Sequence, residues 1–211
     1  EWDAVINSRT LGERGCRCCA GYQLSVTNRL DTQFPDVAAQ WHPTKNGDLT
    51  PADVIAGSHT KVWWKCPVAD DHQWQAMVRS RVRGSSCPCC AGQQLSVTNR
   101  LDRQFPEIAA EWHPTRNGDL TPGDVVTGSN KRIWWKCEVA DDHEWQVRAS
   151  ERTQGKGCPF CSGLRVSVTN SLEAQFPKVA AQWHPTKNGD LLPSEVVAGS
   201  GKKFWWKCDV A

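Results

Sequence analysis

The sequence repeats itself with a fixed period, and this feature constrains its architecture more than any other. The tetrapeptide Trp-Trp-Lys-Cys ends at Cys66, Cys137 and Cys208, so the step is 71 residues both times (66 to 137, then 137 to 208). Such a period is typical of arrays in which each repeat is one small structural unit. We therefore expect four segments: 1–19 as the tail of a preceding repeat, 20–90 and 91–161 as complete repeats, and 162–211 as a C-terminally truncated repeat.

The tryptophans follow the same period. The first complete repeat carries Trp41, Trp63, Trp64 and Trp74, and the later repeats carry the equivalents. Trp2 is left over and matches Trp74 with a slip of one residue. This match supports the assignment of 1–19 to a preceding repeat.

The composition excludes some classes of protein. Apolar residues make up 39% and charged residues 23% of the chain, which is ordinary for a soluble globular protein. No window approaches the ~18 apolar residues that a membrane helix needs, so we expect no membrane partner. Nothing in the pattern points to a small-molecule substrate. The net charge of +2 is too small to demonstrate a nucleic-acid partner by itself.

Local signals in the first repeat predict short helices and a hairpin. Thr27 or Asn28 is the candidate N-cap of a first helix, and Pro35 begins a second helical segment. Segments 61–66 and 73–81 predict two strands, the second because apolar residues alternate along it. Units this small seldom bury enough apolar surface to fold alone, so a metal or disulfides are expected.

Cysteine and histidine recur in each complete repeat as C-x5-H-x14-C-x2-C. Thiolate and imidazole ligands suit tetrahedral Zn²⁺, and the two sulfurs of a C-x2-C pair can reach one ion from one tight turn. The pattern predicts one zinc site in each complete repeat. The predicted ligands are Cys66, His72, Cys87 and Cys90 in the first, and Cys137, His143, Cys158 and Cys161 in the second. Partial sites are expected at Cys16, Cys19 and Cys208.

A rival arrangement would join Cys16 and Cys19 to Cys66 and His72. It closes a loop of 46 residues, whereas the local arrangement closes 14 residues between His72 and Cys87. Loop-closure entropy favours the shorter loop by ~1 kcal/mol. We therefore favour the local arrangement.

Disulfides are the other explanation of the 11 cysteines, but an odd number cannot pair completely within one chain. Disulfide frameworks also do not usually place a histidine in register with the cysteines. Metal sites in turn favour a reducing compartment, most simply the cytoplasm. Cys18 and Cys89 are additional to the pattern, and Phe160 takes their place in the second repeat, so we expect no ligand role for them.

At these residues the chain resembles a known family. The string FPxVAAxWHPTKNGDLxPxxVxxGSxKxxWWKC, followed by HxWQ and CPxC, is similar to the treble-clef zinc-ribbon repeat domain of bacteria and large DNA viruses. The resemblance covers nearly the whole chain and implies small α+β treble-clef units in tandem, each with a β-hairpin and short helices. One departure is visible, because the family's knuckle reads CPxGHxW and the segment from Cys66 to His72 is two residues longer. The resemblance implies no assigned activity.

Basic and aromatic residues recur around the predicted strands. Trp63 and Trp64 would point to opposite faces of a strand, so that one ring packs inside while the other is able to stack on a base. Cations that share a strand face can contact phosphates, although charge on such a face is often only solvation. The candidate nucleic-acid contacts are Lys65, Arg79, Arg81, Lys136, Arg152 and Lys207.

Three further histidines, His42, His113 and His184, lie in the string Trp-His-Pro-Thr. No second ligand lies at metal spacing from them, so we interpret them as helix-end caps beside the preceding tryptophan. Catalysis is not expected, because His72 is needed for zinc and the four protein ligands leave no open position on the ion.

The sequence thus favours a structural zinc array that binds DNA or RNA multivalently. The alternative is a structural or protein-interaction scaffold within a larger assembly, such as a virion or a ribosome-associated complex.

Overall fold

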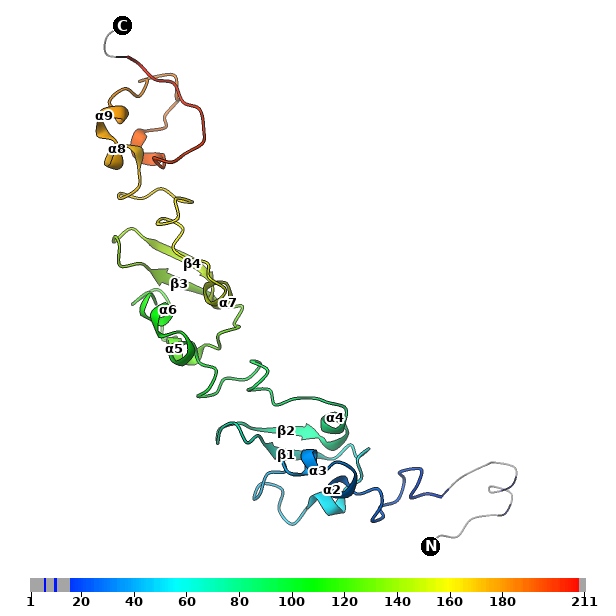
Figure 1. Cartoon of the computed structure of the whole chain (residues 1–211). Coiled ribbons are helices and arrows are strands. Elements are labelled where there is room, and N and C mark those ends of the chain that lie inside the picture. Colours follow the sequence, from blue (N-terminus) through cyan, green and yellow to red (C-terminus); the bar gives the residue numbers. More distant parts are fainter. Residues whose placement is uncertain (1–5, 7–9, 11–15, 209–211) are drawn as a thin grey trace. The chain divides into compact units, whose positions relative to one another are not determined.

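The fold is described from a computed structural model, which describes residue 6, residue 10 and residues 16–208 (Figure 1). Trp2, and most of the predicted segment 1–19, lie outside the described residues. The chain divides into two compact units, Glu1–Thr98 and Asn99–Ala211. The second unit holds two of the sequence repeats. No helix in the described part of the chain is long and apolar enough to cross a membrane.

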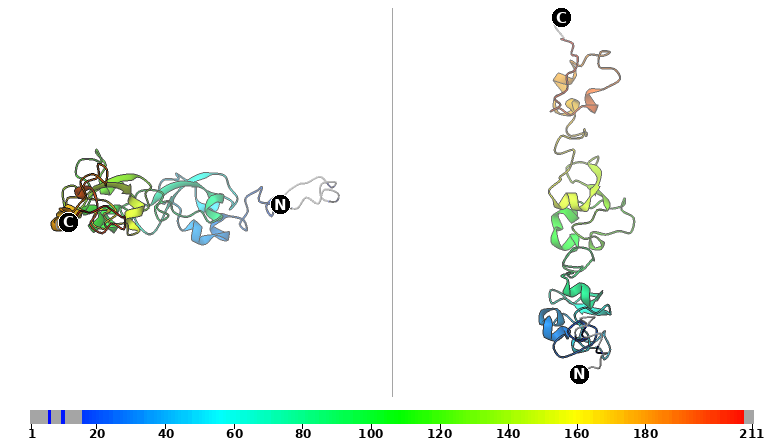
Figure 2. Two further views of the ribbon diagram at one scale, coloured as in Figure 1. Left: turned by 90° about the horizontal axis from the view of Figure 1, so that it is seen from above. Right: turned by 90° about the vertical axis from the view of Figure 1, so that its right-hand side faces the viewer.

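The two complete repeats build the same short elements in the same order, and the described part of the third repeat begins with the same helices (Figures 1 and 2). The first repeat has α2 (Leu30–Gln33), α3 (Pro35–Ala38), the 3₁₀ helix η1 (Pro51–Asp53), β1 (Lys61–Lys65), β2 (Gln73–Met77) and α4 (Val78–Val82). The second has α5 (Leu101–Gln104), α6 (Pro106–Ala110), η2 (Pro122–Asp124), β3 (Arg132–Lys136), β4 (Glu144–Arg148) and α7 (Ala149–Thr153). The third has α8 (Leu172–Gln175), α9 (Pro177–Ala180) and η3 (Pro193–Glu195). The predicted class, small α+β units with a hairpin and short helices, is confirmed.

The core of each complete repeat is a two-stranded antiparallel hairpin covered on one face. In the first repeat β1 pairs with β2 so that Trp64 lies opposite Trp74, and both rings are buried. Trp41 adds an isolated bridge to Trp64 and packs edge-on against its ring, with centroids 5.5 Å apart. Leu30 and Val54 complete this core. The second repeat has the same arrangement around Trp135.

The outer edge of β1 is held by an asparagine side chain. The backbone N–H of Trp63 donates to Asn46 Oδ1 at 2.7 Å, and Asn46 Nδ2 donates to the Trp63 carbonyl at 3.0 Å. The amide group therefore stands in for a further strand residue. Gly47 follows with a φ of +59°, a conformation that favours glycine. The same two contacts recur between Asn117 and Trp134.

The predicted N-cap of the first helix is wrong by one or two residues. Arg29, with extended backbone angles, precedes α2, and it makes no side-chain capping bond. The helix ends at Phe34 because Pro35 disfavours helical angles in the residue before it. Pro35 then occupies the first turn of α3, as predicted.

The predicted strand 73–81 is also too long. Lys61 pairs with Met77 at the end of the ladder, so β1 offers no partner beyond that point. The N–H of Val78 donates instead to the Thr60 carbonyl, and the chain turns into α4. Consequently Arg79 and Arg81 lie on a helical turn and do not share a strand face.

Candidate metal centre

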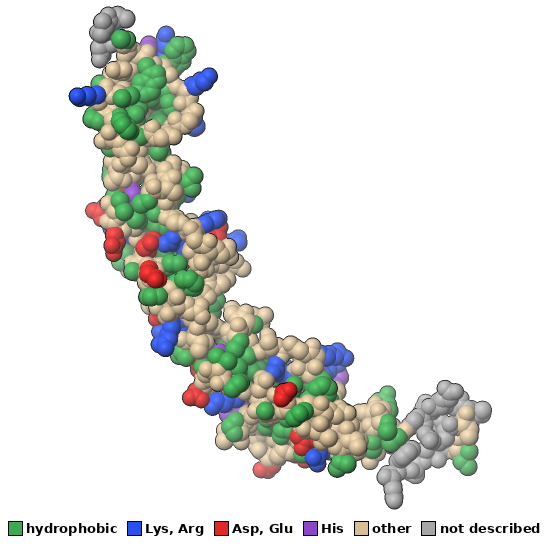
Figure 3. Space-filling model, viewed as in Figure 1, with side chains coloured by type: hydrophobic (Ala, Val, Ile, Leu, Met, Phe, Trp, Pro, Cys, Tyr) green, Lys and Arg blue, Asp and Glu red, His purple; other side chains and the backbone are tan. Residues whose placement is uncertain are grey.

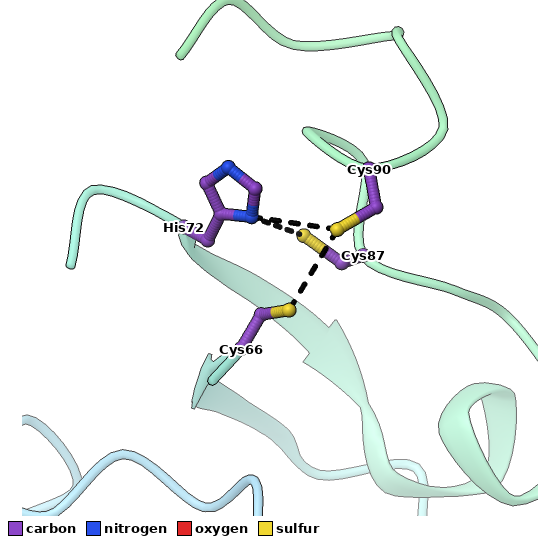
Figure 4. Close-up of side chains that lie close together, drawn as sticks. All are labelled: Cys66, His72, Cys87 and Cys90. Carbon is purple, nitrogen blue, oxygen red and sulfur yellow. Dashed lines mark hydrogen bonds between the residues drawn. The ribbon is translucent and has the colours of Figure 1, made fainter. Parts of the chain in front are cut away.

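Four side chains converge beside the hairpin of the first unit (Figure 4). Cys66 follows β1 and His72 precedes β2, so the ends of paired strands bring them together. Cys87 and Cys90 come from the tight turn after α4. The structure therefore brings together the sequence-near partners that the loop-closure argument favours.

The distances between the four ligand atoms match a tetrahedral zinc centre. Cys66 Sγ lies 3.7 Å from Cys90 Sγ, and His72 Nδ1 lies 3.6 Å from Cys87 Sγ and 3.4 Å from Cys90 Sγ. All four atoms lie within 4.8 Å of one another. Bonds of ~2.3 Å to sulfur and ~2.0 Å to nitrogen at tetrahedral angles require about 3.8 Å between sulfurs and about 3.5 Å between sulfur and nitrogen.

The second unit repeats this geometry. Cys137 Sγ lies 3.7 Å from Cys161 Sγ, and His143 Nδ1 lies 3.7 Å from Cys158 Sγ and 3.5 Å from Cys161 Sγ. Because the same ligand geometry occurs in both units, each centre is suited to the same kind of metal ion.

The knuckle between the first cysteine and the histidine is closed by its own backbone. The N–H of Cys66 donates to the His72 carbonyl at 3.0 Å, and the N–H of His72 donates to the Ala69 carbonyl at 3.2 Å. With these bonds the segment from Cys66 to His72 forms a closed turn, although it is two residues longer than the same segment in the family pattern.

The imidazole of His72 is oriented by two hydroxyl groups on its far side. Its Nδ1 faces the sulfurs, while its Nε2 lies 2.9 Å from Ser96 Oγ and 2.8 Å from Thr98 Oγ1. Metal on Nδ1 leaves the proton on Nε2, which then donates to these hydroxyls. In the second unit the Nε2 of His143 lies 3.0 Å from Ser167 Oγ and 3.1 Å from Thr169 Oγ1.

The sequence Ser-Val-Thr-Asn thus serves the preceding metal centre, a role that our sequence analysis missed. The N–H of Val97, between the two hydroxyl residues, donates to Asp71 Oδ2 at 2.8 Å. The asparagine of the tetrapeptide stabilises the C-x2-C turn, since in the second unit Asn170 Nδ2 donates to the carbonyls of Phe160 and Arg165. The detectable signal was the recurrence of this tetrapeptide at a fixed distance after each C-x2-C pair.

One thiol of each centre, Cys90 in the first and Cys161 in the second, has a raised pKa and therefore tends to stay protonated without metal. The side chain of Cys90 points toward the other ligands (Figure 4). Desolvation, followed by a hydrogen bond with Cys66, raises the pKa of Cys90 to about 12. The same causes, with Cys137 as the partner, raise the pKa of Cys161 to about 12. Metal binding must therefore displace protons, which couples it to pH.

The position before the last cysteine of each C-x2-C pair holds a packed side chain, Cys89 in the first unit and Phe160 in the second. Cys89 is only 1% exposed, and burial raises the pKa of its thiol to about 11. Its equivalent, Phe160, stacks on the ring of His143 with centroids 5.0 Å apart and planes 13° apart. Phe160 therefore supports the ligand histidine of the second unit from one face.

The predicted partial sites are not completed among residues 16–208. Cys16, Cys19 and Cys208 belong to no group of three or more metal-ligating side chains in this part of the chain. The turn at Cys16 nevertheless has the backbone of the complete sites, because the Ala20 N–H donates to the Cys16 carbonyl as the Ala91 N–H does to that of Cys87.

Two of the predicted nucleic-acid contacts are wrong. Arg81 and Arg152 are buried, with exposed fractions of 8% and 5%. Arg81 donates to Gln40 Oε1 at 2.6 Å, and Arg152 lies 2.7 Å from Glu111 Oε2. A phosphate cannot reach either guanidinium, because the turn into a helix places both against the tryptophan core.

The other predicted contacts lie at the surface. Lys65 and Lys136 are partly exposed and pair with Asp70 and Asp141 at 2.8 and 2.9 Å. Lys207 is exposed. Arg79 Nη1 lies 2.8 Å from His59 Nε2.

The histidine of the Trp-His-Pro-Thr string caps its own turn. His42 is buried, and its Nδ1 accepts hydrogen bonds from the N–H groups of Thr44 and Lys45. Its Nε2 lies 3.0 Å from Gln73 Oε1. His113 and His184 accept the equivalent bonds. No second metal group forms around them within the described residues.

A pair of strand ends and a C-x2-C turn that present three thiols and one imidazole define a small zinc-finger domain. A family model described as "Probable Treble clef zinc finger domain" matches the chain three times, at residues 37–93, 108–164 and 179–211. These matches span more than half of the chain, which therefore belongs to this family. No curated protein matches the sequence.

The protein accordingly binds structural zinc, about one ion per complete repeat. Three thiolates and one imidazole fill the four positions of a tetrahedral ion. Such closed sites stabilise folds and leave no position for substrate.

Proposed function

We propose that the chain is a multivalent nucleic-acid-binding array that uses the outer face of each hairpin. One observation carries the proposal. In all three repeats a cation lies over the ring of the outward-facing tryptophan. Lys45 Nζ lies 4.4 Å from the Trp63 ring centre, and the equivalent distances are 4.6 Å for Arg116 over Trp134 and 4.7 Å for Lys187 over Trp205.

Strand alternation adds further cations to this face. Lys61, Trp63 and Lys65 project to the same side of β1, because side chains two residues apart share a face. Arg132, Trp134 and Lys136 do the same on β3. Aromatic rings stack on bases without sequence preference, while Lys and Arg neutralise phosphates. The chemistry of this face therefore suits a nucleic acid.

Polar side chains extend the same surface in the first unit. A shallow groove is lined by Trp63 and by residues that include Gln73, Gln75, Ser80 and Gln94. Amide and hydroxyl groups of this kind donate to phosphate and sugar oxygens. Weak contacts at each repeat would multiply along the array.

A structural or protein-interaction scaffold is the second candidate, and the charge distribution favours it. Lys65 and Lys136 are paired with aspartates. Lys and Arg side chains are interspersed with Asp and Glu on the visible surface of each unit (Figure 3). We propose no catalytic role for either candidate. The zinc-ligand cysteines form no disulfide in the described part of the chain, which supports a reducing compartment such as the cytoplasm.

Fluorescence anisotropy with labelled single-stranded and duplex oligonucleotides tests the proposal across a salt titration. We expect binding that weakens steeply as salt rises, because counterions are released from the phosphates. Trp63→Ala combined with Trp134→Ala should weaken binding by at least ~tenfold, since stacking contributes ~1–3 kcal/mol per base.

The matched control is Val68→Ala combined with Val139→Ala, which trims exposed apolar residues on the knuckles. This variant should bind as the parent does, and zinc content should be unchanged in both. Absence of binding at low salt, or binding that salt does not affect, would favour the scaffold.

A further inference from the structure

A buried guanidinium accompanies each zinc centre. The Arg81 guanidinium lies 5.2 Å from the ring centre of Trp74 and 5.6 Å from that of Trp64. These two tryptophans lie two residues from the ligands His72 and Cys66. A zinc ion bound by three thiolates and a neutral imidazole carries a net charge of −1, so a buried cation nearby compensates it.

The compensation differs between the two units. Arg81 donates to the neutral amide of Gln40 at 2.6 Å, which leaves its positive charge available to the first centre. Arg152 packs on the equivalent rings but is paired with the carboxylate of Glu111 at 2.7 Å. The pair is neutral overall. The negative charge of the second centre is therefore less compensated.

Two further positions change in the same direction. The residue after the first cysteine ligand is Pro67 in the first unit and Glu138 in the second. The residue after the histidine ligand is Gln73 in the first unit and Glu144 in the second. Glu138 is exposed and partly screened by solvent, whereas Glu144 is partly buried and lies 2.9 Å from Arg116 Nη2. This pair is neutral, whereas the equivalent residues of the first unit are the cation Lys45 and the uncharged Gln73. Three neutral positions around the first centre are thus acidic around the second.

We propose that the second centre is a modification site, at which electrophiles attack zinc-bound thiolates in preference to the first centre. Attack by a neutral electrophile removes one negative charge from the centre, so less compensated charge makes the sulfur more nucleophilic. Cys161 is the exposed ligand of this centre. The inference does not depend on whether the chain binds nucleic acid.

The reaction with N-ethylmaleimide illustrates the bonds that form and break and the change in charge. The sulfur of Cys161, which would be a zinc ligand in the loaded chain, adds its lone pair to an alkene carbon, forming an S–C bond as the carbon–carbon π bond breaks. The adjacent carbon takes a proton from water, and the hydroxide ion that remains carries away the negative charge. The product is a neutral thioether, and the net charge of the centre rises from −1 to 0.

Peptide mapping by mass spectrometry after brief treatment of the zinc-loaded chain with limiting N-ethylmaleimide tests the proposal. We expect the ligands Cys137, Cys158 and Cys161 to be alkylated about five- to tenfold faster than Cys66, Cys87 and Cys90, on the basis of roughly twofold per additional charge. The difference should narrow at high salt. Zinc release, followed with a chromogenic chelator, should parallel alkylation.

Charge-swap variants separate this cause from simple exposure. Alkylation of the second centre should slow to the rate of the first when its three acidic positions are neutralised together, by Glu111→Gln, Glu138→Gln and Glu144→Gln. Alkylation of the first centre should accelerate when the equivalent positions are made acidic together, by Gln40→Glu, Pro67→Glu and Gln73→Glu. Asp190→Asn removes an exposed acid from the third repeat and should change neither rate.

Equal rates at the two centres of the parent chain would overturn the proposal. A rate difference that persists unchanged through both swaps would also overturn it, because the cause would then be exposure and not charge. Zinc content before treatment, measured on each variant, distinguishes a loss of reactivity from a loss of the centre itself.

Discussion

The Nε2 atom of His72 lies 2.8 Å from the hydroxyl oxygen of Thr98, although Thr98 follows all four metal ligands in the chain. The first zinc centre therefore includes residues beyond its last cysteine. The hydroxyls of Ser96 and Thr98 fix the ring so that Nδ1 faces the sulfurs. A fragment that ends at Cys90 would contain the four ligands but lack this support.

Removing the two hydroxyls should weaken zinc binding at the first centre. We expect Ser96→Ala combined with Thr98→Val to lower the affinity of that centre about 10- to 100-fold, because outer contacts of this kind orient the ligand histidine. Competition with a chelator of known affinity measures the change. The unaltered second centre is an internal reference, and Ser194→Ala, at an exposed position, is the control. Equal affinity in the double variant and the parent would contradict the role.

Truncation of the buried arginine should destabilise the first hairpin. Arg81→Met removes the bond to Gln40 and the contacts with the rings of Trp64 and Trp74. We expect a loss of about 2–3 kcal/mol, since a charged hydrogen bond and two cation–π contacts disappear from a buried site. Hydrogen exchange of the β1 and β2 amides measures it.

The second hairpin, β3–β4, provides the reference in the same molecule for the arginine variant. Arg79→Met, a change at the surface end of the same helical turn, is the matched control and should cost far less. Equal protection of both hairpins in Arg81→Met would show that the arginine is dispensable.

The metal ligands could be predicted from the sequence because their spacing is a local property. A C-x2-C turn and a hairpin need only short-range geometry, and Cys66 and His72 lie at the two ends of the loop of such a hairpin. The roles of the Ser96 and Thr98 hydroxyls depend on a turn that returns the chain to His72, which no local propensity encodes. A short polar tetrapeptide before a helix was therefore interpreted as a cap.

The buried arginines were misplaced for a related reason. Alternation of side chains predicts a strand as far as residue 81, but a strand continues only while it has a partner. Because β1 begins at Lys61, the ladder ends at Met77 and the following residues turn into a helix. Tertiary pairing, which the alternation pattern does not contain, thus decides whether Arg81 faces solvent or the core.

Zinc removal should unfold both hairpins. Zinc joins the end of β1, the start of β2 and the turn after α4, so chelation in a reducing buffer breaks the cross-link that holds three segments together. We expect loss of amide protection in the hairpins and exposure of the Trp64 and Trp135 rings, which are fully buried. A red shift of tryptophan fluorescence reports the exposure.

Added Zn²⁺ should reverse the effect of chelation, whereas Mg²⁺ should not, because Mg²⁺ prefers oxygen ligands. Hairpins that keep their amide protection after complete zinc removal would show that the metal does not hold them.

The buried thiol of Cys89 should make the first unit sensitive to alkali. Burial raises the pKa of Cys89 to about 11, above an ordinary thiol value of about 8.5. A raised pKa in the folded state stabilises the fold fully below about pH 8.5, and this contribution is lost as the pH rises toward about 11. Cys89→Phe removes the titrating group and introduces the ring that Phe160 stacks on His143 in the second unit. We expect the melting temperature of the parent to fall more steeply than that of the variant between pH 8 and pH 10.5, measured in a reducing buffer with excess zinc.

At pH 7 the variant should hold zinc at least as tightly as the parent, because ring stacking contributes roughly 0.5–1.5 kcal/mol. Phe160→Cys is the reciprocal change and should give the second unit the alkaline sensitivity that it lacks, while parallel melting curves for all three proteins would contradict the assignment.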